Sequence, residues 1–211
     1  GQAPEHVLED ARTLAGTGLE HLSVYMLDLD KPCPMKAQIE AGRLQAPNED
    51  QVADAFEALQ QELPRLGLSP YEISNYARPG GESRHNLRYW ERRPYLGLGP
   101  GAASQMADFR WTESAVLRAW TAGEGGLDVQ KLDRAQALAE IPLLGLRLHR
   151  GVDWAALRTL AGAQHLLPLV EAWEAELERF FPAGLLARDG ATLRLTPKGM
   201  LLSNAVLQTF V

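Results

Sequence analysis

An amphipathic helix lies between two short β-type segments in residues 21–74, and this order narrows the possible folds more than any other part of the sequence. HLSVYML (21–27) and Tyr71–Ser74 are typical of buried strands. Between them, Asn48 can cap a helix, with Gln51 reaching back to complete a capping box. The apolar face of this helix consists of Val52, Phe56, Leu59 and Leu63. A strand–helix–strand unit predicts parallel strands with a right-handed crossover, and so an α/β fold.

The chain places a helix before the first of these strands. Glu5–Ala15 carries apolar residues at helical spacing, and Gly16 and Gly18 supply its end. Residues 35–41 are expected to form a further short helix. Because a helix comes first and a strand only afterwards, the sequence suggests an α/β unit cut in the middle.

Two segments before residue 127 have weaker patterns. YLGLGPGA (95–102) is predicted as a buried strand that runs into a tight turn, where glycines allow the close approach of another backbone or of a ligand. A packing role and a ligand-binding role both fit. Trp111–Glu124 is predicted to be a helix and linker, with GEGG (123–126) at a domain boundary.

The pattern changes to helices and a hairpin after residue 126. Three helices are predicted, at Asp133–His149, Asp153–Ala161 and Leu166–Phe180. A hairpin over 184–196 turns at Asp189-Gly190, and a last helix closes the chain. This order resembles a winged-helix domain, which suggests DNA binding. The candidate recognition helix, however, is rich in glutamate, so we predict packing against the first domain and no DNA binding.

Composition restricts the functional class. With 45% hydrophobic and 23% charged residues, the 211-residue chain has the make-up of a soluble globular protein, and its net charge of −6 argues against a general nucleic-acid binder. No apolar run approaches the roughly 20 residues of a transmembrane segment, and no secretory signal opens the chain. The single cysteine, Cys33, excludes an internal disulfide and fits a reducing compartment, so a cytoplasmic location and a plain loop thiol are expected.

The candidate site is a group of polar and aromatic side chains within residues 84–90. Its members are His85, Asn86, Tyr89 and Trp90, flanked by Arg84 and Arg88. One interpretation is a core segment whose indole and phenol tips form hydrogen bonds. The other is a site for a flat, partly anionic aromatic ligand, with the large rings for stacking, the arginines for carboxylates and His85 for a metal.

Six segments resemble, in order, the C-terminal half of the heme chaperone HemW family, also described as oxygen-independent coproporphyrinogen III oxidase-like, radical S-adenosylmethionine (SAM) proteins. The segments are HLSVYML, YEISNYARPG, ESRHNLRYW, YLGLGPGAAS, LLGLRLHRGVD and LRLTPKGMLLSN. The YEISN and HNxxYW signatures favour HemW over the true coproporphyrinogen dehydrogenases, which lack them.

The resemblance implies the C-terminal part of a radical-SAM partial (β/α)6 barrel, with the HNxxYW segment, over residues 1–122. It implies a winged-helix-like C-terminal domain of the HemW/HemN type over residues 127–211. The family's N-terminal half would be absent, and with it the CxxxCxxC loop that binds a [4Fe–4S] cluster and most of the SAM site. We therefore expect this chain alone to hold no cluster and to be inactive as a radical enzyme.

The resemblance also implies site residues. HNLRYW matches the family's HNxxYW, proposed for heme binding, so the heme-binding residues would be His85, Asn86, Tyr89 and Trp90, with the histidine as a candidate iron ligand. Arg84 and Arg88 are candidates to pair with the heme propionates. The loop after residues 21–27 and the GPGAAS turn would approach SAM, which points to Asp28 and Ala103.

These implications lead to two functions of different classes. The first is heme binding and delivery of heme to acceptor proteins. The second is porphyrinogen oxidation by a radical enzyme whose active site lies largely outside this chain. The resemblance also predicts a marginally stable portion that self-associates through an exposed barrel edge. The sequence leaves the heme acceptor and the oligomeric state open.

Overall fold

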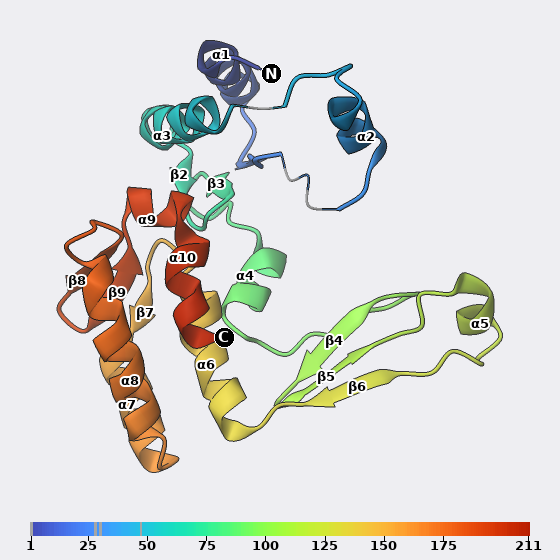
Figure 1. The fold of residues 1–211 in the computed structure, drawn as a ribbon, viewed down its shortest axis with the longest axis vertical. Coiled ribbons are helices and arrows are strands. Elements are labelled where there is room, and N and C mark those ends of the chain that lie inside the picture. The colour runs from blue at the N-terminus through green and yellow to red at the C-terminus, as the bar shows by residue number, and fades with distance from the viewer. Residues whose placement is uncertain (1, 28, 30, 47) are drawn as a thin grey trace. The chain divides into compact units, whose positions relative to one another are not determined.

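The computed structural model describes the chain except for residues 1, 28, 30 and 47. The chain divides into two compact units, Gly1–Glu82 and Ser83–Val211 (Figure 1). Both units combine helices with short antiparallel sheets, so the predicted mixture of α and β structure is confirmed. Within the described part of the chain, no helix is long and apolar enough to cross a membrane.

The first unit packs helices on a small sheet. Its described elements are α1 (Pro4–Gly16), β1 (His21–Ser23), α2 (Pro34–Glu40), α3 (Glu49–Arg65), β2 (Ser69–Pro70) and β3 (Asn75–Ala77). The predicted cap of α3 is confirmed, because Asn48 Oδ1 accepts hydrogen bonds from the backbone N–H groups of Asp50 and Gln51 at 2.9 and 3.2 Å. Helices α1 and α3 pack together, and the buried cluster at this contact consists of Ala11, Ala15, Leu59, Leu63, Leu68 and Tyr76.

Strand pairing in the first unit differs from the sequence prediction. The order of the sheet is β1-β3-β2 and both pairs are antiparallel. The strands before and after α3, β1 and β2, therefore run in the same direction, but β3 lies between them, so the expected direct parallel pairing is wrong. The reason is that residues 71–74 form a turn between β2 and β3 where a strand was expected. The backbone N–H of Tyr71 donates to the carbonyl oxygen of Asn75 at 3.1 Å, and a carboxylate oxygen of Glu72 accepts from the N–H of Ser74 at 3.0 Å. The strand predicted for residues 21–27 is also shorter, since β1 ends at its third residue.

The second unit begins with α4 (Arg84–Trp90) and an antiparallel meander. Its strands are β4 (Ala103–Met106), β5 (Phe109–Thr112) and β6 (Asp128–Lys131), and the short helix α5 (Leu117–Thr121) lies between the last two. The helix predicted for 111–124 is therefore wrong over most of its length, because Trp111 pairs with Ser104 and Val129 across the sheet. Residues 123–126, predicted as an interdomain linker, connect α5 to β6 within one sheet.

The glycine-rich segment 95–102 is not a strand, apart from a single bridge between Tyr95 and Gln105. At Gly97, a Cβ atom would lie 2.2 Å from the carbonyl oxygen of Ala103. The backbone N–H of Gly97 also donates to Ser104 Oγ at 3.0 Å. Close backbone contact, one of the two predicted roles of these glycines, is therefore confirmed at Gly97.

Helices and a three-stranded sheet complete the second unit. They are α6 (Arg134–Gly145), β7 (Val152–Asp153), α7 (Trp154–Ala163), α8 (Leu167–Leu177), β8 (Leu186–Asp189), β9 (Thr192–Leu195), α9 (Pro197–Leu201) and α10 (Ser203–Leu207), with 3₁₀ turns at Glu178–Phe180 and Gln208–Phe210. The predicted hairpin is confirmed, because β8 and β9 pair and Gly190 at the turn has a φ of 57°. The core of these elements includes Leu138, Trp154, Val170, Trp173, Leu193 and Phe210.

A buried carboxylate joins the meander and the end of α4 to α6. Glu140, on α6, is only 7% exposed, and its oxygens lie 2.7 Å from Arg92 Nε and 2.6 Å from Arg110 Nη2. Arg92 also pairs with Asp108, at the turn between β4 and β5, at 3.2 Å. These ion pairs hold α4 and the meander in a defined position on α6, and so they position the candidate site on α4.

Candidate functional site

Helix α4 carries the residues that the sequence predicts for the site. Ser83 begins the helix, because its Oγ accepts a hydrogen bond from the backbone N–H of Asn86 at 3.2 Å. The helix is short because Arg92, just beyond its end, has a φ of 52°, a conformation that stops helical hydrogen bonding. Residues four apart lie on one face of a helix, and α4 brings His85 and Tyr89 together in this way.

His85 and Tyr89 form a hydrogen-bonded pair at the surface. Tyr89 Oη lies 3.0 Å from His85 Nε2, and the two rings meet edge to face with their centroids 4.8 Å apart. His85 is exposed and Tyr89 is half-buried. Tyr95 packs edge-on against the other side of Tyr89 at a centroid distance of 4.6 Å. The phenol of Tyr89 is thus held between two rings, with an imidazole nitrogen beside its oxygen.

Trp90 contacts a different part of the unit. The guanidinium of Arg147 lies over its indole, with Cζ 5.3 Å from the ring centroid. Trp90 Nε1 is buried and has no hydrogen-bond partner among the described residues. With Ile141 and Leu148, the indole lines a cavity of about 210 Å³. The structure therefore packs Trp90 against α6 and the residues after it, and does not join it to the pair formed by His85 and Tyr89.

The two candidate arginines are exposed on α4. Arg88 Nη1 donates a hydrogen bond to the carbonyl oxygen of Pro94 at 2.9 Å, so the loop after α4 holds its side chain in place. That loop then exposes two leucines: Leu96 is 63% exposed and Leu98 is 86% exposed. Helix α4 and the loop after it thus expose both positive charge and apolar side chains, the two kinds of group that a flat apolar ligand with carboxylates would use.

The two residues predicted to approach SAM have different outcomes. Asp28 lies outside the described residues. Ala103 is the first residue of β4 and is exposed, and it lines a cavity of about 130 Å³ with Tyr95, Arg110 and Trp111 among others. This cavity shares Tyr95 with the aromatic contact at α4. SAM contacts at Asp28 and Ala103 stay predictions.

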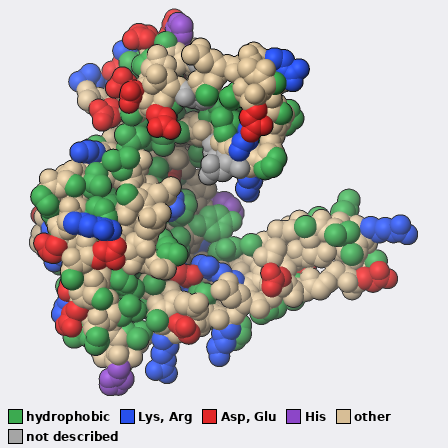
Figure 2. Space-filling model, viewed as in Figure 1, with side chains coloured by type: hydrophobic (Ala, Val, Ile, Leu, Met, Phe, Trp, Pro, Cys, Tyr) green, Lys and Arg blue, Asp and Glu red, His purple; other side chains and the backbone are tan. Residues whose placement is uncertain are grey.

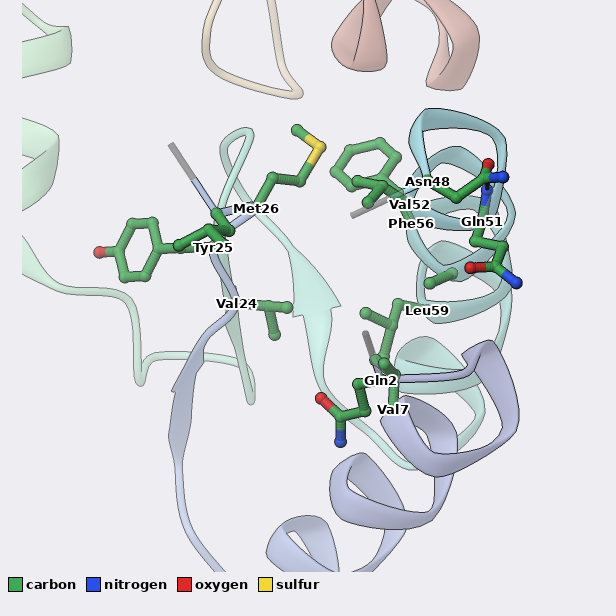
Figure 3. A pocket seen from close by; sticks show the side chains of 12 residues that line it. Gln2, Val7, Val24, Tyr25, Met26, Asn48, Gln51, Val52, Phe56 and Leu59 are labelled. Atoms are coloured by element: carbon green, nitrogen blue, oxygen red, sulfur yellow. Dashed lines mark hydrogen bonds between the residues drawn. The ribbon is translucent and has the colours of Figure 1, made fainter. Parts of the chain in front are cut away.

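An apolar cavity in the first unit is not foreseen by the sequence. It has a volume of about 310 Å³ and lies between α1, the residues after β1 and α3 (Figure 3). Met26 points toward Phe56 across it, whereas the ring of Tyr25 points away from α3 (Figure 3). The pattern of residues 21–27 suggests one continuous buried strand, so it carries no signal that the segment leaves the sheet after Ser23 and lines a cavity.

Cys33 stands at the start of a helix. Its half-buried Sγ accepts a hydrogen bond from the backbone N–H of Lys36 at 3.4 Å, at the N-terminus of α2. Among the residues that the structure describes, no group of three or more His, Cys, Asp or Glu side chains is arranged to hold a metal ion. Cys33 thus has a structural contact at a helix end.

Comparison with known proteins first defines the fold class. Residues 132–202 match the family model of the HemN C-terminal domain. The whole fold resembles the solved structure of coproporphyrinogen III oxidase (HemN) from Escherichia coli, described as a radical SAM enzyme, with a TM-score of 0.75 and 17% sequence identity. The similarity covers 99% of this chain and 52% of that structure. The chain therefore has the mixed α/β fold of the C-terminal part of a HemN-like protein.

Sequence comparison then identifies the nearer relatives. The chain is 31% identical over its full length to the heme chaperone HemW of Mycobacterium tuberculosis, and covers 52% of it. It is 28% identical to HemW of Bacillus subtilis, again over its full length, and covers 56% of that protein. Radical S-adenosyl methionine domain-containing protein 1 of Mus musculus is 29% identical over 91% of the chain. The chain spans about half the length of these curated relatives, and its resemblance to the HemW heme chaperone family is confirmed.

Proposed function

We propose that this chain is the heme-binding portion of a HemW-type heme chaperone that delivers heme to acceptor proteins. The observation that carries the proposal is the surface pair of His85 and Tyr89 on α4, because imidazole and phenolate are both iron ligands in heme proteins. The similarity to HemW heme chaperones over the whole chain supports the same function.

The surroundings of the pair suit the rest of a heme molecule. Exposed Leu96 and Leu98 would contact the porphyrin, because apolar surface gains free energy when a flat apolar ligand covers it. Arg84 and Arg88 would pair with the propionates. Of the other predicted site residues, Asn86 would bind a propionate or orient the imidazole, and Trp90 would act by holding α4 in place.

A heme titration of matched variants tests this function. Ferric heme added to the purified chain should give a saturable change in visible absorbance. In the double variant His85→Ala/Tyr89→Phe the affinity should fall at least about tenfold, or about 1.4 kcal/mol. The circular dichroism spectrum should stay unchanged, because the imidazole is exposed and phenylalanine keeps the ring contact with Tyr95.

The double variant His6→Ala/Tyr25→Phe is the control, because it removes the same two functional groups from exposed positions in the first unit. The control should bind heme like the unaltered chain. No saturable binding by the unaltered chain, or equal affinities for the two double variants, would contradict a heme site on α4.

The second candidate function is that of a coproporphyrinogen III oxidase-like radical SAM oxidoreductase in porphyrin synthesis. The fold similarity to Escherichia coli HemN favours it. On this proposal, residues 1–122 are part of a partial (β/α)6 barrel and residues 127–211 are a winged-helix-like domain. Asp28 and Ala103 would approach SAM. The protein would act in the cytoplasm. A [4Fe–4S] cluster would supply the electron for SAM cleavage.

Iron–sulfur reconstitution tests whether this chain can supply the cluster site. The chain has one cysteine, whereas a [4Fe–4S] cluster of this kind needs three cysteine thiolates. Anaerobic reconstitution followed by gel filtration should therefore leave a colourless protein without bound sulfide. Stoichiometric iron and sulfide with the broad absorbance of a cluster would show that the chain holds one by other ligands.

A further inference from the structure

The segment between β5 and β6 carries large apolar side chains at its surface. This segment, residues 114–127, is called the meander tip below; it contains α5 and lies at the end of the meander away from α6 (Figure 1). The exposed fractions are 63% for Val116, 62% for Leu117, 38% for Trp120 and 53% for Leu127. Single exposed apolar side chains are common on proteins, but a group of them is typical of a surface that another molecule covers.

Three of these side chains share one side of α5. Trp120 follows Val116 by four residues and Leu117 by three, and the backbone N–H of Trp120 donates to the carbonyl oxygen of Val116 at 2.9 Å. Residues three and four apart are neighbours on a helix surface. The tip therefore presents its aliphatic and aromatic groups together.

Backbone hydrogen bonds hold the meander tip in a defined conformation. The N–H groups of Glu124 and Gly125 both donate to the carbonyl oxygen of Ala119, at 2.9 and 3.0 Å. A Cβ atom at Gly125 would lie 2.7 Å from Ser114 Cβ, so the returning chain closes tightly against the start of the tip. The apolar side chains are thus held outward by a folded segment, which lowers the entropic cost of binding another molecule.

We infer that the meander tip is a membrane-contact surface that inserts its apolar side chains into the interfacial region of a lipid bilayer. Tryptophan suits this depth, because its ring is apolar and its N–H is polar. The two charged residues of the tip, Arg118 and Glu124, balance each other, which suits lipids whose headgroups carry both charges. This inference goes beyond the proposed heme-binding function and does not depend on it.

The small size of the tip favours a bilayer over a protein partner. A stable protein–protein interface takes roughly 20–30 residues from each side. The meander tip is one short loop with a single helical turn, and its apolar group consists of Val116, Leu117, Trp120 and Leu127. A bilayer surrounds each inserted side chain, so a narrow tip can bury its apolar surface there without a large matching surface.

Co-sedimentation of the full chain with phosphatidylcholine vesicles tests the contact. The bound fraction should rise with lipid concentration and stay the same between about 0.1 and 1 M NaCl, because apolar contact is not screened by salt. Val116→Ser/Leu117→Ser should lower the affinity for vesicles at least about tenfold. The control Met106→Ser/Val129→Ser removes apolar side chains that are 54% and 56% exposed on the strands of the same meander, and should bind like the unaltered chain.

Quenching of tryptophan fluorescence by brominated phosphatidylcholine tests which residue enters the bilayer. The unaltered chain should be quenched, whereas Trp120→Phe should lose the quenching and still sediment with vesicles, since phenylalanine keeps an apolar ring. No vesicle binding by the unaltered chain, equal losses in the two double variants, or quenching that persists in Trp120→Phe would overturn the inference. A change in the mass of Val116→Ser/Leu117→Ser without lipid would also overturn it, because the tip would then bind a second copy. Heme titration of the same variant should match the unaltered chain, which separates this surface from the site on α4.

Discussion

At the scale of single residues, Glu140 forms the ion pairs that join α6 to the segments next to the candidate site. Its carboxylate is buried between Arg92 and Arg110. Glu140→Ala should lower the free energy of unfolding by about 3 kcal/mol, because it leaves two partly buried cations without their partner. Glu176→Ala is the control, since Glu176 pairs with Arg179 at the surface and should cost less than about 1 kcal/mol. Urea unfolding followed by circular dichroism measures both; similar losses in the two variants would contradict the role of Glu140.

His149 is expected to make the second unit sensitive to acid. Burial, and then the positive charge of Arg194, lower the pKa of its imidazole from 6.5 to about 4. Between these pH values the unfolded chain binds a proton that the folded chain does not, so protonation favours unfolding. The group has no effect on the free energy of unfolding well above pH 6.5, and should lower it by up to about 3 kcal/mol as the pH falls toward 4.

Unfolding curves at several pH values test this expectation. His149→Leu should remove most of the loss of stability between pH 6.5 and 4, because the substituted side chain cannot bind the proton. His6→Leu, at an exposed position on α1, serves as the control. An acid-induced loss that is equally steep in His149→Leu and the unaltered chain would show that other groups cause it.

The site residues were partly predictable from the sequence. If the segment is helical, the spacing of four residues places His85 and Tyr89 on one face, as the structure has them. It could not show that Trp90 packs under Arg147, because that contact joins residues far apart in the chain. Glu140 was also missed, since its partners Arg92 and Arg110 lie on separate elements.

At the scale of elements, loss of the N-cap of α4 should weaken heme binding, whereas loss of a comparable cap on another helix should lower stability alone. Ser83→Ala removes the hydrogen bond to the N–H of Asn86 and should cost about 1 kcal/mol. Asp153→Ala removes the equivalent bond to Ala156 at α7 and is the matched control. Both variants should lose similar stability, but only Ser83→Ala should weaken heme binding, because only α4 carries the pair. Equal heme affinities in the two variants would contradict this.

Two variants of Trp90 test how strongly the packing of α4 on α6 stabilises the fold. Trp90→Ala should lower the free energy of unfolding by about 3 kcal/mol, because it opens a cavity and removes the contact with Arg147. Trp90→Phe should cost less than about 1 kcal/mol, since it also removes a buried N–H without a described partner. Thermal unfolding compares the two. A loss in Trp90→Phe as large as that in Trp90→Ala would show that the indole nitrogen has an important partner.

The elements that sequence reasoning located correctly are those with local signals. The cap at Asn48 and the turn at Asp189-Gly190 both depend on neighbouring residues. The meander was missed although residues 107–108 join β4 and β5 in a short turn, because strand preference depends strongly on context and β6 pairs with β5 from beyond α5.

At the scale of the whole molecule, the chain contains two compact units and corresponds to about half of its HemW relatives. Each unit exposes apolar side chains, some of which stand on the surface in Figure 2. In the first unit, Tyr25 and Met26 are 71% and 42% exposed next to β1, an edge strand of its sheet. In the second, Val116 and Leu117 are 63% and 62% exposed beside α5. Neither surface could be read from hydrophobic periodicity, because Tyr25 and Met26 follow the end of β1, and Val116 and Leu117 stand at the start of the short helix α5.

Self-association, proposed from the expected barrel edge, should depend on the first of these surfaces. Edge strands with adjoining apolar side chains pair readily with a second chain, and lysine substitutions oppose such pairing through charge. Sedimentation velocity should show an average mass that rises with protein concentration, and Tyr25→Lys/Met26→Lys should reduce that rise. The control Val116→Lys/Leu117→Lys adds the same charge on the meander and should leave the rise unchanged. A monomer at every concentration would refute self-association. If only the control variant reduced the rise, the contact would lie on the meander and not next to β1.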